Sequence, residues 1–577
     1  KIKIAARAQS TCSMLSWCLA LVLPGLAGSQ SADANHAAPV PAATARMWAN
    51  QLVGAPAPFA ETIITRLEEA HKASKGGVPN EALVAAANWL AQAARTGGKA
   101  SQVQYLKRAS CLYDAVFKPH VLASPHDFFL RSNYSTALIR CRRFAEAVQV
   151  MEEALANIRE DHPSFARAVA TLMIAAQRAG NLTKAADLAE EHWDRISSVG
   201  GDVRWDFLRA VAAFRRPALV CRAADELHEL AQKGDPDVLD GGEEVYFVLA
   251  KAHRDTHNVT HMAEAALNAC DLAYEKGIES GHLPEQTTRF LQAADSAVKA
   301  NIKRLSRVQS PPGGLPSLIM IVGAPRSGTS MLENILVAAG IQDVVALGEA
   351  PVLHHLAQQA EAELGTNYLA QISDSVAIRK NFSRRLVEAL SAAVTEWKQA
   401  DWLGDHGGSF HDEQNSPYTY VTKWPLDFTH IPLAALLLEE KLRVLHCQRD
   451  ARDTALSIYM EGFKPGNLWL WTFNLTGIRW FFAAYMQLMQ TLLSVFSSIL
   501  MSVWYEDLVQ NFDETVAAVA RFLGWSFGAA EAARARDFHT LQREVLTASR
   551  DQVRQALYSQ SIGRWHAVKH PRFLQLF

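Results

Sequence analysis

The pattern of apolar and polar positions changes near residue 300. Between residues 61 and 303, Ala and Leu recur at three- and four-residue spacing, and Gly or Pro marks short breaks. This spacing is typical of successive amphipathic helices. Beyond residue 316, helical patterns alternate with short apolar runs at residues 317–322, 342–346, 441–447 and 499–505. Such alternation predicts a parallel β-sheet flanked by helices. We therefore expect an all-α part followed by an α/β part.

Three segments of the helical part resemble one another. Leu138–Val148 reads as a helix end, a short turn and a new helix, Ile174–Ala186 repeats this layout, and Leu249–His261 is a weaker third copy. The matching positions Phe144 and Leu182 are 38 residues apart, whereas a tetratricopeptide repeat has a period of about 34. The pattern predicts a degenerate tetratricopeptide-like array with a concave face for a partner. An irregular helical domain without true repeats is the alternative.

Breaker residues separate the two parts. Residues 304–316 contain three Pro and two Gly, which is typical of a linker. The predicted organisation is an apolar and low-complexity tail over residues 1–60, a helical repeat domain over 61–303, the linker over 304–316, and the α/β domain over 317–577.

Two uncharged apolar segments raise the question of a membrane. Met14–Gly28 follows basic residues and has the outline of a secretory signal peptide, although an upstream tail is the alternative. Trp480–Tyr505 contains no charged residue, but it carries several Gln and Ser and changes character near Ile499. We interpret this second segment as a core helix, a turn and a buried strand rather than a transmembrane span.

Composition narrows the class of protein. The chain has 577 residues, 49% of them hydrophobic and 20% charged, with a formal net charge of -2. These values are typical of a globular protein with more than one domain, and they do not favour nucleic acid. Any anion site must then be a local concentration of Arg and Lys. The seven cysteines are scattered without a C-x-x-C pair, which argues against a disulfide framework and a structural zinc site.

The loop after the first predicted strand is the strongest sign of chemistry. The spacing from Gly323 to Gly328 matches the ATP-binding P-loop, G-x-x-x-x-G-K-[ST], in which backbone N–H groups and a helix N-terminus cradle phosphate. Thr329 occupies the position of the lysine, however, and Arg326 lies inside the loop. The loop therefore predicts an anion site that does not handle its ligand like the end of an ATP.

Polar residues also follow the later strands. Glu349 comes just after the second predicted strand, and Lys423 precedes a helical run at Ile431–Leu438. Taken singly, they read as a solvated glutamate and a surface lysine. Their interest lies in their position, because the carboxyl ends of parallel strands meet at one edge of a sheet, where ligands bind.

A further strand runs directly into Arg449. The strand Leu442–Gln448 is followed by Arg449 and, eight residues later, by Ser457 on a predicted helix. Arg449 can form a forked contact to a phosphate, to which Ser457 can also bind. An ordinary strand-to-helix turn with a capping aspartate is the alternative. The segment beginning at Tyr505 ends the last strand and opens a predicted helix that runs through Phe522.

Four motifs in order resemble the sulfotransferase superfamily, whose members use 3′-phosphoadenosine-5′-phosphosulfate: Pro325–Ser330, Arg449–Ser457, Tyr505–Leu508 and Ser561–Trp565. The resemblance covers about residues 315 to 570. It is closest to bacterial proteins in which tetratricopeptide repeats precede such a domain, and these are distantly similar to tyrosylprotein sulfotransferases. The resemblance implies a sulfotransferase fold, which is a P-loop-type parallel sheet.

The resemblance also implies roles for individual residues. The loop that would hold the 5′-phosphosulfate comprises Arg326, Ser327, Gly328, Thr329 and Ser330. Those expected at the 3′-phosphate and beside the nucleotide are Arg449, Ser457 and Tyr505, with Ser549 and Arg564 in a segment that closes over the cofactor. Glu349 matches a general base and Lys423 a catalytic lysine, which would act together with Arg326.

Histidines offer two alternatives. His354 or His355 is a rival for the base, because other sulfotransferases use histidine. His406 and His411 lie in a Gly-rich loop with Asp405 and Asp412, but no supporting cluster accompanies them. We therefore expect no metal site.

The expected function is the in-line transfer of a sulfuryl group from this donor to an acceptor hydroxyl, which leaves adenosine 3′,5′-bisphosphate. The alternatives are a P-loop kinase or other NTPase, and a helical-repeat scaffold that no longer turns over. The helical repeats favour a protein or peptide acceptor, and we expect neither nucleic acid nor a membrane as a partner. Because the donor is made in the cytosol, we expect a cytoplasmic protein, with export or membrane association through the N-terminal segment as the alternative.

Overall fold

The computed structural model describes most of the chain, namely residues 42–52, 57–73, 78–96, 99–199, 201–212, 216–235, 242–305, 315–341, 344–399, 419–463, 468–541, 553 and 555–574. The chain divides into two compact units, Lys1–Glu229 and Leu230–Phe577. Each unit is described below by itself.

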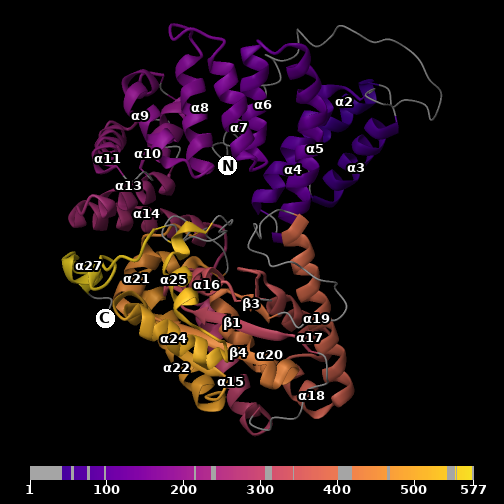
Figure 1. Cartoon of the computed structure of the whole chain (residues 1–577), viewed down its shortest axis with the longest axis vertical. Coiled ribbons are helices and arrows are strands. Elements are labelled where there is room, and N and C mark those ends of the chain that lie inside the picture. Colours follow the sequence, from indigo (N-terminus) through magenta and orange to yellow (C-terminus); the bar gives the residue numbers. More distant parts are fainter. Residues whose placement is uncertain are drawn as a thin grey trace. The chain divides into compact units, whose positions relative to one another are not determined.

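The first unit is built from paired helices (Figure 1). Its helices are α2 (Ala42–Gln51), α3 (Ala57–Ala73), α4 (Asn80–Thr96), α5 (Lys99–Ala123), α6 (Phe128–Arg140), α7 (Phe144–Leu155), α8 (Phe165–Arg178), α9 (Leu182–Ser197), α10 (Gly201–Val211) and α11 (Pro217–Gln232), the last of which extends across the division. Helices α4 and α5, α6 and α7, and α8 and α9 contact each other as neighbours in sequence. The expectation of an all-α part made of helical pairs is confirmed.

The three similar segments share one turn geometry. The second residue after the first helix has a positive φ in each, at Arg142 (63°), Gly180 (88°) and His257 (60°). The N–H of the next residue, Arg143, Asn181 or Asn258, then donates to the carbonyl five residues earlier at 2.9, 2.9 and 2.8 Å. This is the hydrogen bond of a Schellman motif, which ends a helix and redirects the chain. Whether the pairs form a tetratricopeptide array stays a prediction.

The second unit combines three helices with a parallel sheet. Helices α13 (Glu243–Asp255), α14 (Val259–Glu279) and α15 (Gln286–Leu305) precede the strands β1 (Ser317–Gly323), β2 (Val344–Ala346), β3 (Thr419–Thr422), β4 (Leu442–Gln448) and β5 (Leu500–Trp504). The strand order is β2-β3-β1-β4-β5, and every neighbouring pair is parallel. The predicted α/β class is confirmed, but β3 was not among the predicted strands.

Helices cover the sheet and connect its strands (Figure 1). Those between β1 and β4 are α16 (Thr329–Ala338), α17 (Val352–Leu364), α18 (Tyr368–Asp374), α19 (Val376–Gln399), η1 (Pro425–His430), α20 (Ile431–Leu438) and η2 (Glu439–Lys441). After β4 come α21 (Ala451–Tyr459), η3 (Leu470–Phe473), α22 (Leu475–Val495), α23 (Tyr505–Gln510), α24 (Phe512–Leu523), α25 (Ala529–Arg536), η4 (Phe538–Thr540), η5 (Arg564–Ala567) and α27 (Pro571–Leu574). The single helix predicted from Tyr505 to Phe522 is therefore two helices, α23 and α24.

The order of the strands determines where a ligand can bind. Strand β1 is buried at every position except its first, as expected of a central strand with helices on both faces. The chain builds β2 and β3 on one side of β1, and then β4 and β5 on the other. The connections therefore diverge between β1 and β4, and this kind of switch point opens a crevice at the carboxyl ends of the strands.

The apolar segment from Trp480 has the predicted structure. Helix α22 ends at Val495, and β5 begins at Leu500. The helix packs on α15, and Gln487 and Thr491 on α22 donate to the buried carboxylate of Asp295 on α15, each at 2.7 Å. In the part of the chain that the structure describes, no helix combines the length and apolarity needed to cross a membrane.

The predicted domain boundaries stay a prediction. Helices α13 to α15 pack in the same compact unit as the sheet, although the predicted linker 304–316 separates them from it in sequence. Most of that linker, residues 306–314, lies outside the described residues, as do residues 1–41 of the predicted tail. Helix α2 begins inside the tail segment, at Ala42.

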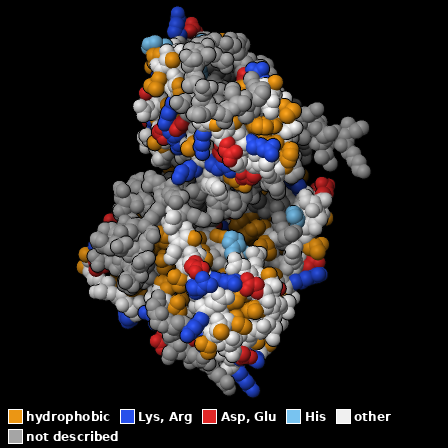
Figure 2. All heavy atoms as spheres, turned by 90° about the vertical axis from the view of Figure 1, so that its right-hand side faces the viewer, with side chains coloured by type: hydrophobic (Ala, Val, Ile, Leu, Met, Phe, Trp, Pro, Cys, Tyr) orange, Lys and Arg blue, Asp and Glu red, His pale blue; other side chains and the backbone are white. Residues whose placement is uncertain are grey.

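Figure 2 shows acidic and basic side chains interspersed among the described residues of the face it presents.

Candidate active site

The loop after β1 is shaped by close backbone approaches. A Cβ atom on Gly323 would lie 2.5 Å from the carbonyl oxygen of Cys447 on β4. Gly328 has a φ of 103°, and a Cβ there would lie 3.0 Å from the Tyr505 ring. Arg326 itself has a φ of 70°, a left-handed conformation that is uncommon for a residue with a side chain. The loop is therefore held between β4 and α23 in a strained conformation, and such conformations cluster at ligand sites.

Arg326 lies buried between two partners. Its Nε donates to Ser457 Oγ at 3.2 Å, and its Nη2 lies 3.3 Å from Glu461 Oε2. Burial lowers the pKa of the Arg326 guanidinium; the carboxylate of Glu461 opposes this shift, and the charges of Arg254 and Arg449 add to it. Arg326 is thus a buried cation with other cations near it, and an anionic ligand would relieve both effects.

Arg449 lies just beyond β4 and joins the loop to a distant segment. Its Nη1 donates to the carbonyl of Arg326 at 3.1 Å, and its Nη2 donates to the carbonyl of Ser561 at 2.7 Å. Its guanidinium lies 4.7 Å from the centre of the Tyr505 ring, within range of a cation–π interaction. The Nε of Arg449 is buried and has no hydrogen-bond partner among the described residues. A buried donor in this state is costly, so it marks a place for a ligand acceptor.

The turn after Arg449 also caps a helix, which was the alternative interpretation of this segment. The Asp450 carboxylate accepts hydrogen bonds from the backbone N–H groups of Arg452 and Asp453 and so caps α21. The carboxylate of Asp453 in turn accepts from the N–H groups of Gly563 and Trp565, at 2.6 and 2.9 Å. Helix α21 therefore anchors the segment that carries Ser561 and Arg564.

Arg564 completes a group of three arginines. Its Nη2 donates to Ser561 Oγ at 3.0 Å. Burial lowers the pKa of the Arg564 guanidinium, and the charges of Arg254 and Arg449 lower it further. Three guanidiniums from separate segments thus converge around the two serines Ser457 and Ser561.

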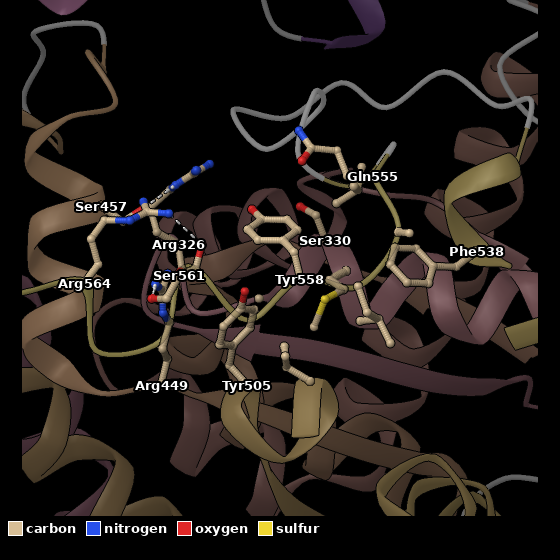
Figure 3. Close-up of a pocket in the computed structure, with 16 residues that line it drawn as sticks. Arg326, Ser330, Arg449, Ser457, Tyr505, Phe538, Gln555, Tyr558, Ser561 and Arg564 are labelled. Atoms are coloured by element: carbon tan, nitrogen blue, oxygen red, sulfur yellow. Dashed lines mark hydrogen bonds between the residues drawn. The ribbon is translucent and has the colours of Figure 1, made fainter. Parts of the chain in front are cut away.

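These residues line one pocket (Figure 3). The space around its walls is about 600 Å³, which includes open solvent, and the part enclosed by them is about 50 Å³. Arg326, Arg449 and Arg564 gather at one end with the serines, whereas Tyr505, Tyr558 and Phe538 extend along the rest. The predicted residues on its wall are Arg326, Gly328, Ser330, Arg449, Ser457, Tyr505 and Arg564.

The other predicted cofactor residues lie elsewhere. Ser327 and Thr329 are buried in the loop but are not on the wall of the pocket, and Ser327 Oγ has no hydrogen-bond partner among the described residues. Ser549 lies outside the described residues, so its place stays a prediction.

Glu349 and Lys423 form an ion pair outside the wall of this pocket. Lys423 Nζ lies 2.8 Å from Glu349 Oε1; the lysine side chain is 1% exposed and the glutamate side chain 24%. The N–H of Lys423 also donates to the carbonyl of Gly348 at 2.7 Å, which ties the end of β3 to the turn after β2. Burial raises the pKa of the Cys447 thiol on β4, and the charge of Lys423 opposes that shift. The ammonium therefore lies near the ends of the central strands, close to the start of the loop.

The rival histidines lie beside this pair. The His354 ring is 4.8 Å from that of Trp424, the residue after Lys423, and His354 Nδ1 is 3.3 Å from His430 Nε2. Burial lowers the pKa of His354, and the neighbouring His355, which is itself exposed, lowers it further. Burial lowers the pKa of His430 to about 3, with a contribution from His354. His354 is neutral at pH 7 and remains an alternative base.

An aspartate is buried in the same region. Asp427, in η1, is 1% exposed, and neither of its carboxylate oxygens has a hydrogen-bond partner among the described residues. Burial raises its pKa well above the usual range of an aspartate. Burial therefore disfavours the charged form of Asp427.

The described residues contain no group of three or more His, Cys, Asp or Glu side chains that could hold a metal ion. His406 and His411, with Asp405 and Asp412, lie outside the described residues. For that loop the expectation stays a prediction.

Some residues of the pocket were missed by sequence reasoning. Tyr558 and Phe538 line it, and Glu461 contacts Arg326 from the loop after α21. Tyr558 lies three residues before the Ser561 motif, which was a usable signal. Glu461 gave no signal, because its place depends on how the loop after α21 folds back.

Comparison with known proteins identifies a family for the C-terminal half of the chain. Residues 316–529 match the model of the sulfotransferase family. The C-terminal half of the chain therefore contains a sulfotransferase-family domain, as the four motifs predicted. An uncharacterized protein of Aquifex aeolicus (strain VF5) is 25% identical over 252 residues, a match that covers 43% of this chain and 30% of that relative's length.

Solved sulfotransferase domains are similar to the same half. The domain from the Synechococcus PCC 7002 olefin synthase is 14% identical and matches 47% of this chain and 96% of its own, with a TM-score of 0.29. The domain from the curacin biosynthetic pathway is 14% identical, with 46% and 97% covered and a TM-score of 0.28. Sulfotransferase STF9 from Mycobacterium avium is 13% identical, with 49% and 80% covered and a TM-score of 0.23.

Proposed function

We propose that the second unit transfers a sulfuryl group from 3′-phosphoadenosine-5′-phosphosulfate to an acceptor hydroxyl. One observation carries the proposal. Arg326, from the loop after β1, lines the same pocket as Arg449 and Ser457, which come from the junction of β4 and α21. A donor with negative groups at two positions needs cations from two separate segments, and this pocket provides them.

The pocket also fits the rest of such a nucleotide. Its arginine end offers the unpartnered Nε of Arg449 and the hydroxyl of Ser457 to phosphate oxygens, and Ser330 lies beside Tyr558 further along (Figure 3). Its aromatic end offers Tyr558 and Phe538, and aromatic rings stack on the faces of bases. The sulfonate would then face the corner that holds Glu349 and Lys423.

In the proposed reaction, the acceptor oxygen attacks the sulfur in line. The new oxygen–sulfur bond forms as the bond between sulfur and the bridging phosphate oxygen breaks, and the hydroxyl proton passes to Glu349. Sulfuryl transfer resembles phosphoryl transfer in asking the protein mainly for position and charge stabilisation. Arg326 and Lys423 would supply that stabilisation at the sulfonate and at the departing phosphate.

The ion pair between Lys423 and Glu349 suits this role. An ammonium at 2.8 Å keeps the carboxylate ionised and therefore able to accept a proton. As Glu349 gains the proton, its attraction for Lys423 weakens, and the ammonium becomes available to the charge that develops on the leaving oxygen. The pair thus couples proton removal to stabilisation of the leaving group.

The proposed chemistry relies on fixed cations and involves no metal ion. A transferring sulfonate carries less negative charge than a terminal phosphate, so buried guanidiniums and an ammonium can suffice to stabilise it. The departure from the P-loop at Thr329 agrees with this, because the missing lysine is the one that reaches the terminal phosphates of ATP.

The acceptor, partner and location belong to the same proposal. Paired helices can present a surface to a protein or peptide, and so we propose a hydroxyl on such a chain as the acceptor. We propose the cytoplasm as the location, because the donor is made there. Nucleic acid is not proposed as a partner, since the net charge is only -2.

Calorimetry on the full chain tests the donor. Adenosine 3′,5′-bisphosphate should bind one-to-one in the presence of a chelator. ATP with magnesium should bind far more weakly, because the loop lacks the lysine of a P-loop nucleoside triphosphatase. Tight binding of ATP with magnesium, without binding of the bisphosphate, would replace the proposal with a kinase or NTPase.

A further inference from the structure

Helix α13 lies directly on the loop that follows α21. The Lys251 ammonium lies 3.1 Å from the carbonyl oxygen of Glu461 and 3.3 Å from its carboxylate. A Cβ atom on Gly462 would lie 2.9 Å from the ring of Phe247. Glu461 also contacts Arg326, as described above, so one carboxylate joins a helix that precedes the sheet in sequence to the phosphosulfate loop.

The contacts follow one stripe of α13. Phe247, Lys251 and Arg254 occupy positions i, i+4 and i+7, which lie on one face of a helix. Phe247 lies against Gly462, and Lys251 contacts Glu461. Residues later in α13 therefore lie against residues earlier in the loop, which are closer to α21. Arg254 is the next residue of this stripe, and Ser457 is the site residue on α21.

Cations gather around Arg326, which lines the pocket and shares the carboxylate of Glu461 with Lys251 of this stripe. The basic residues there, among those the structure describes, are Arg254, Arg326, Arg449, Arg564 and Lys251, and ion pairs join some of them to Glu461 and Asp255. The charge of Arg254 lowers the pKa of both Arg326 and Arg564. Cations that destabilise one another in this way bind a multiply charged anion favourably.

Arg254 itself stays charged, and although it is not on the wall of the pocket, its charge acts on two arginines that are. Its side chain is 19% exposed, and its Nε and Nη2 donate to the carboxylate of Asp255 at 2.6 and 3.0 Å. Burial opposes its charge, but the hydrogen bonds and the charge of Asp255 outweigh burial and raise its pKa. Asp255 is 41% exposed, so it can give way to a more highly charged ligand.

We propose that Arg254 is a fourth arginine of the donor site, and that it contacts the 3′-phosphate together with Arg449 and Ser457. This inference rests on the proposed function. It assigns to the helices before the sheet a direct part in holding the donor. The phosphate is a monoester with a charge near -2, which suits a place where several cations gather.

Two substitutions with opposite expected signs test the inference. In Arg254→Gln, the dissociation constant of adenosine 3′,5′-bisphosphate should rise about tenfold, the order expected for one charge-assisted hydrogen bond. Binding of adenosine 5′-monophosphate should change by less than about twofold, because it lacks the 3′-phosphate. In Asp255→Asn, the bisphosphate should bind more tightly, because Arg254 loses its competing carboxylate. A purely structural role for Arg254 would not produce this gain.

The matched control is Arg289→Gln, which removes the same group from an exposed position on α15. It should leave both affinities unchanged. Calorimetry on the full chain gives the affinities, and thermal melting checks that each variant is folded.

The outcomes separate the two proposals. If the wild-type chain binds the bisphosphate, but Arg254→Gln and Asp255→Asn both bind it like wild type, the inference is overturned and the proposed function stands. If Arg254→Gln weakens both nucleotides equally, Arg254 does not contact the 3′-phosphate. If the wild-type chain does not bind the bisphosphate at all, the proposed function fails, and the inference fails with it.

Discussion

The pocket lined by three arginines and the corner of Glu349 and Lys423 handle charge in opposite ways. In the pocket, three guanidiniums crowd together, and burial lowers the pKa of Arg326 and Arg564. In the corner, the single ammonium already has a carboxylate at 2.8 Å. An unbalanced site gains free energy by binding an anion, whereas a balanced pair gains little and can instead exchange a proton. Under the proposed function, the first region mainly binds the donor and the second exchanges the proton.

Substitution in the corner should produce the largest effect. Glu349→Gln keeps the shape of the side chain but removes the base, so turnover should fall by about 10²–10⁴-fold. Affinity for adenosine 3′,5′-bisphosphate should stay nearly unchanged, because Glu349 does not line the pocket. Transfer of radiolabelled sulfate and calorimetry measure the two quantities separately.

The control for this substitution is Glu363→Gln, which makes the same change on the exposed face of α17 and should not affect either quantity. Unchanged turnover in Glu349→Gln, with a large loss in His354→Gln, would transfer the role of base to the histidine. A large loss of nucleotide affinity in Glu349→Gln would remove the contrast between the two regions.

Substitution in the pocket should act on affinity. Arg449→Ala removes hydrogen bonds to a charged group, and the dissociation constant of the bisphosphate should rise by about 10- to 150-fold. Arg443→Ala removes the same charge from the other end of β4 and serves as the control. If both variants bound the nucleotide equally well by calorimetry, the proposed pocket would not be the donor site.

The third effect concerns stability in acid. The pKa of His430 is about 3 in the folded chain, against about 6.5 in an unfolded one. Between these values the unfolded chain binds a proton that the folded chain does not. Stability should therefore fall as the pH drops from about 6.5 toward 3, by at most about 1.4 kcal/mol per pH unit from this residue.

Denaturant unfolding at several pH values measures this slope. It should be flatter in His430→Gln and unchanged in His355→Gln, because His355 is exposed. Equal slopes in wild type and His430→Gln would show that His430 is not held neutral by burial.

Much of the donor site could be predicted from the sequence, because its residues follow strand ends. Arg326 follows β1 and Arg449 follows β4, and parallel strands bring such positions to one edge. The same reasoning predicted that Lys423 and Glu349 lie at this edge of the sheet. Strand β3, in contrast, has only four residues, too few to show a periodic pattern. The positions of Arg254 and Glu461 depend on packing between segments about two hundred residues apart, which local patterns do not encode.

Mass spectrometry of candidate acceptors tests the central claim most directly. Host proteins and glycans would be incubated with the full chain, the phosphosulfate donor and a chelator, alongside Glu349→Gln as a matched protein. The account predicts that hydroxyl-bearing molecules gain a sulfonate group with the wild-type chain and far less with the variant. No sulfonate gain with this donor, together with phosphate gain from ATP and magnesium, would contradict it.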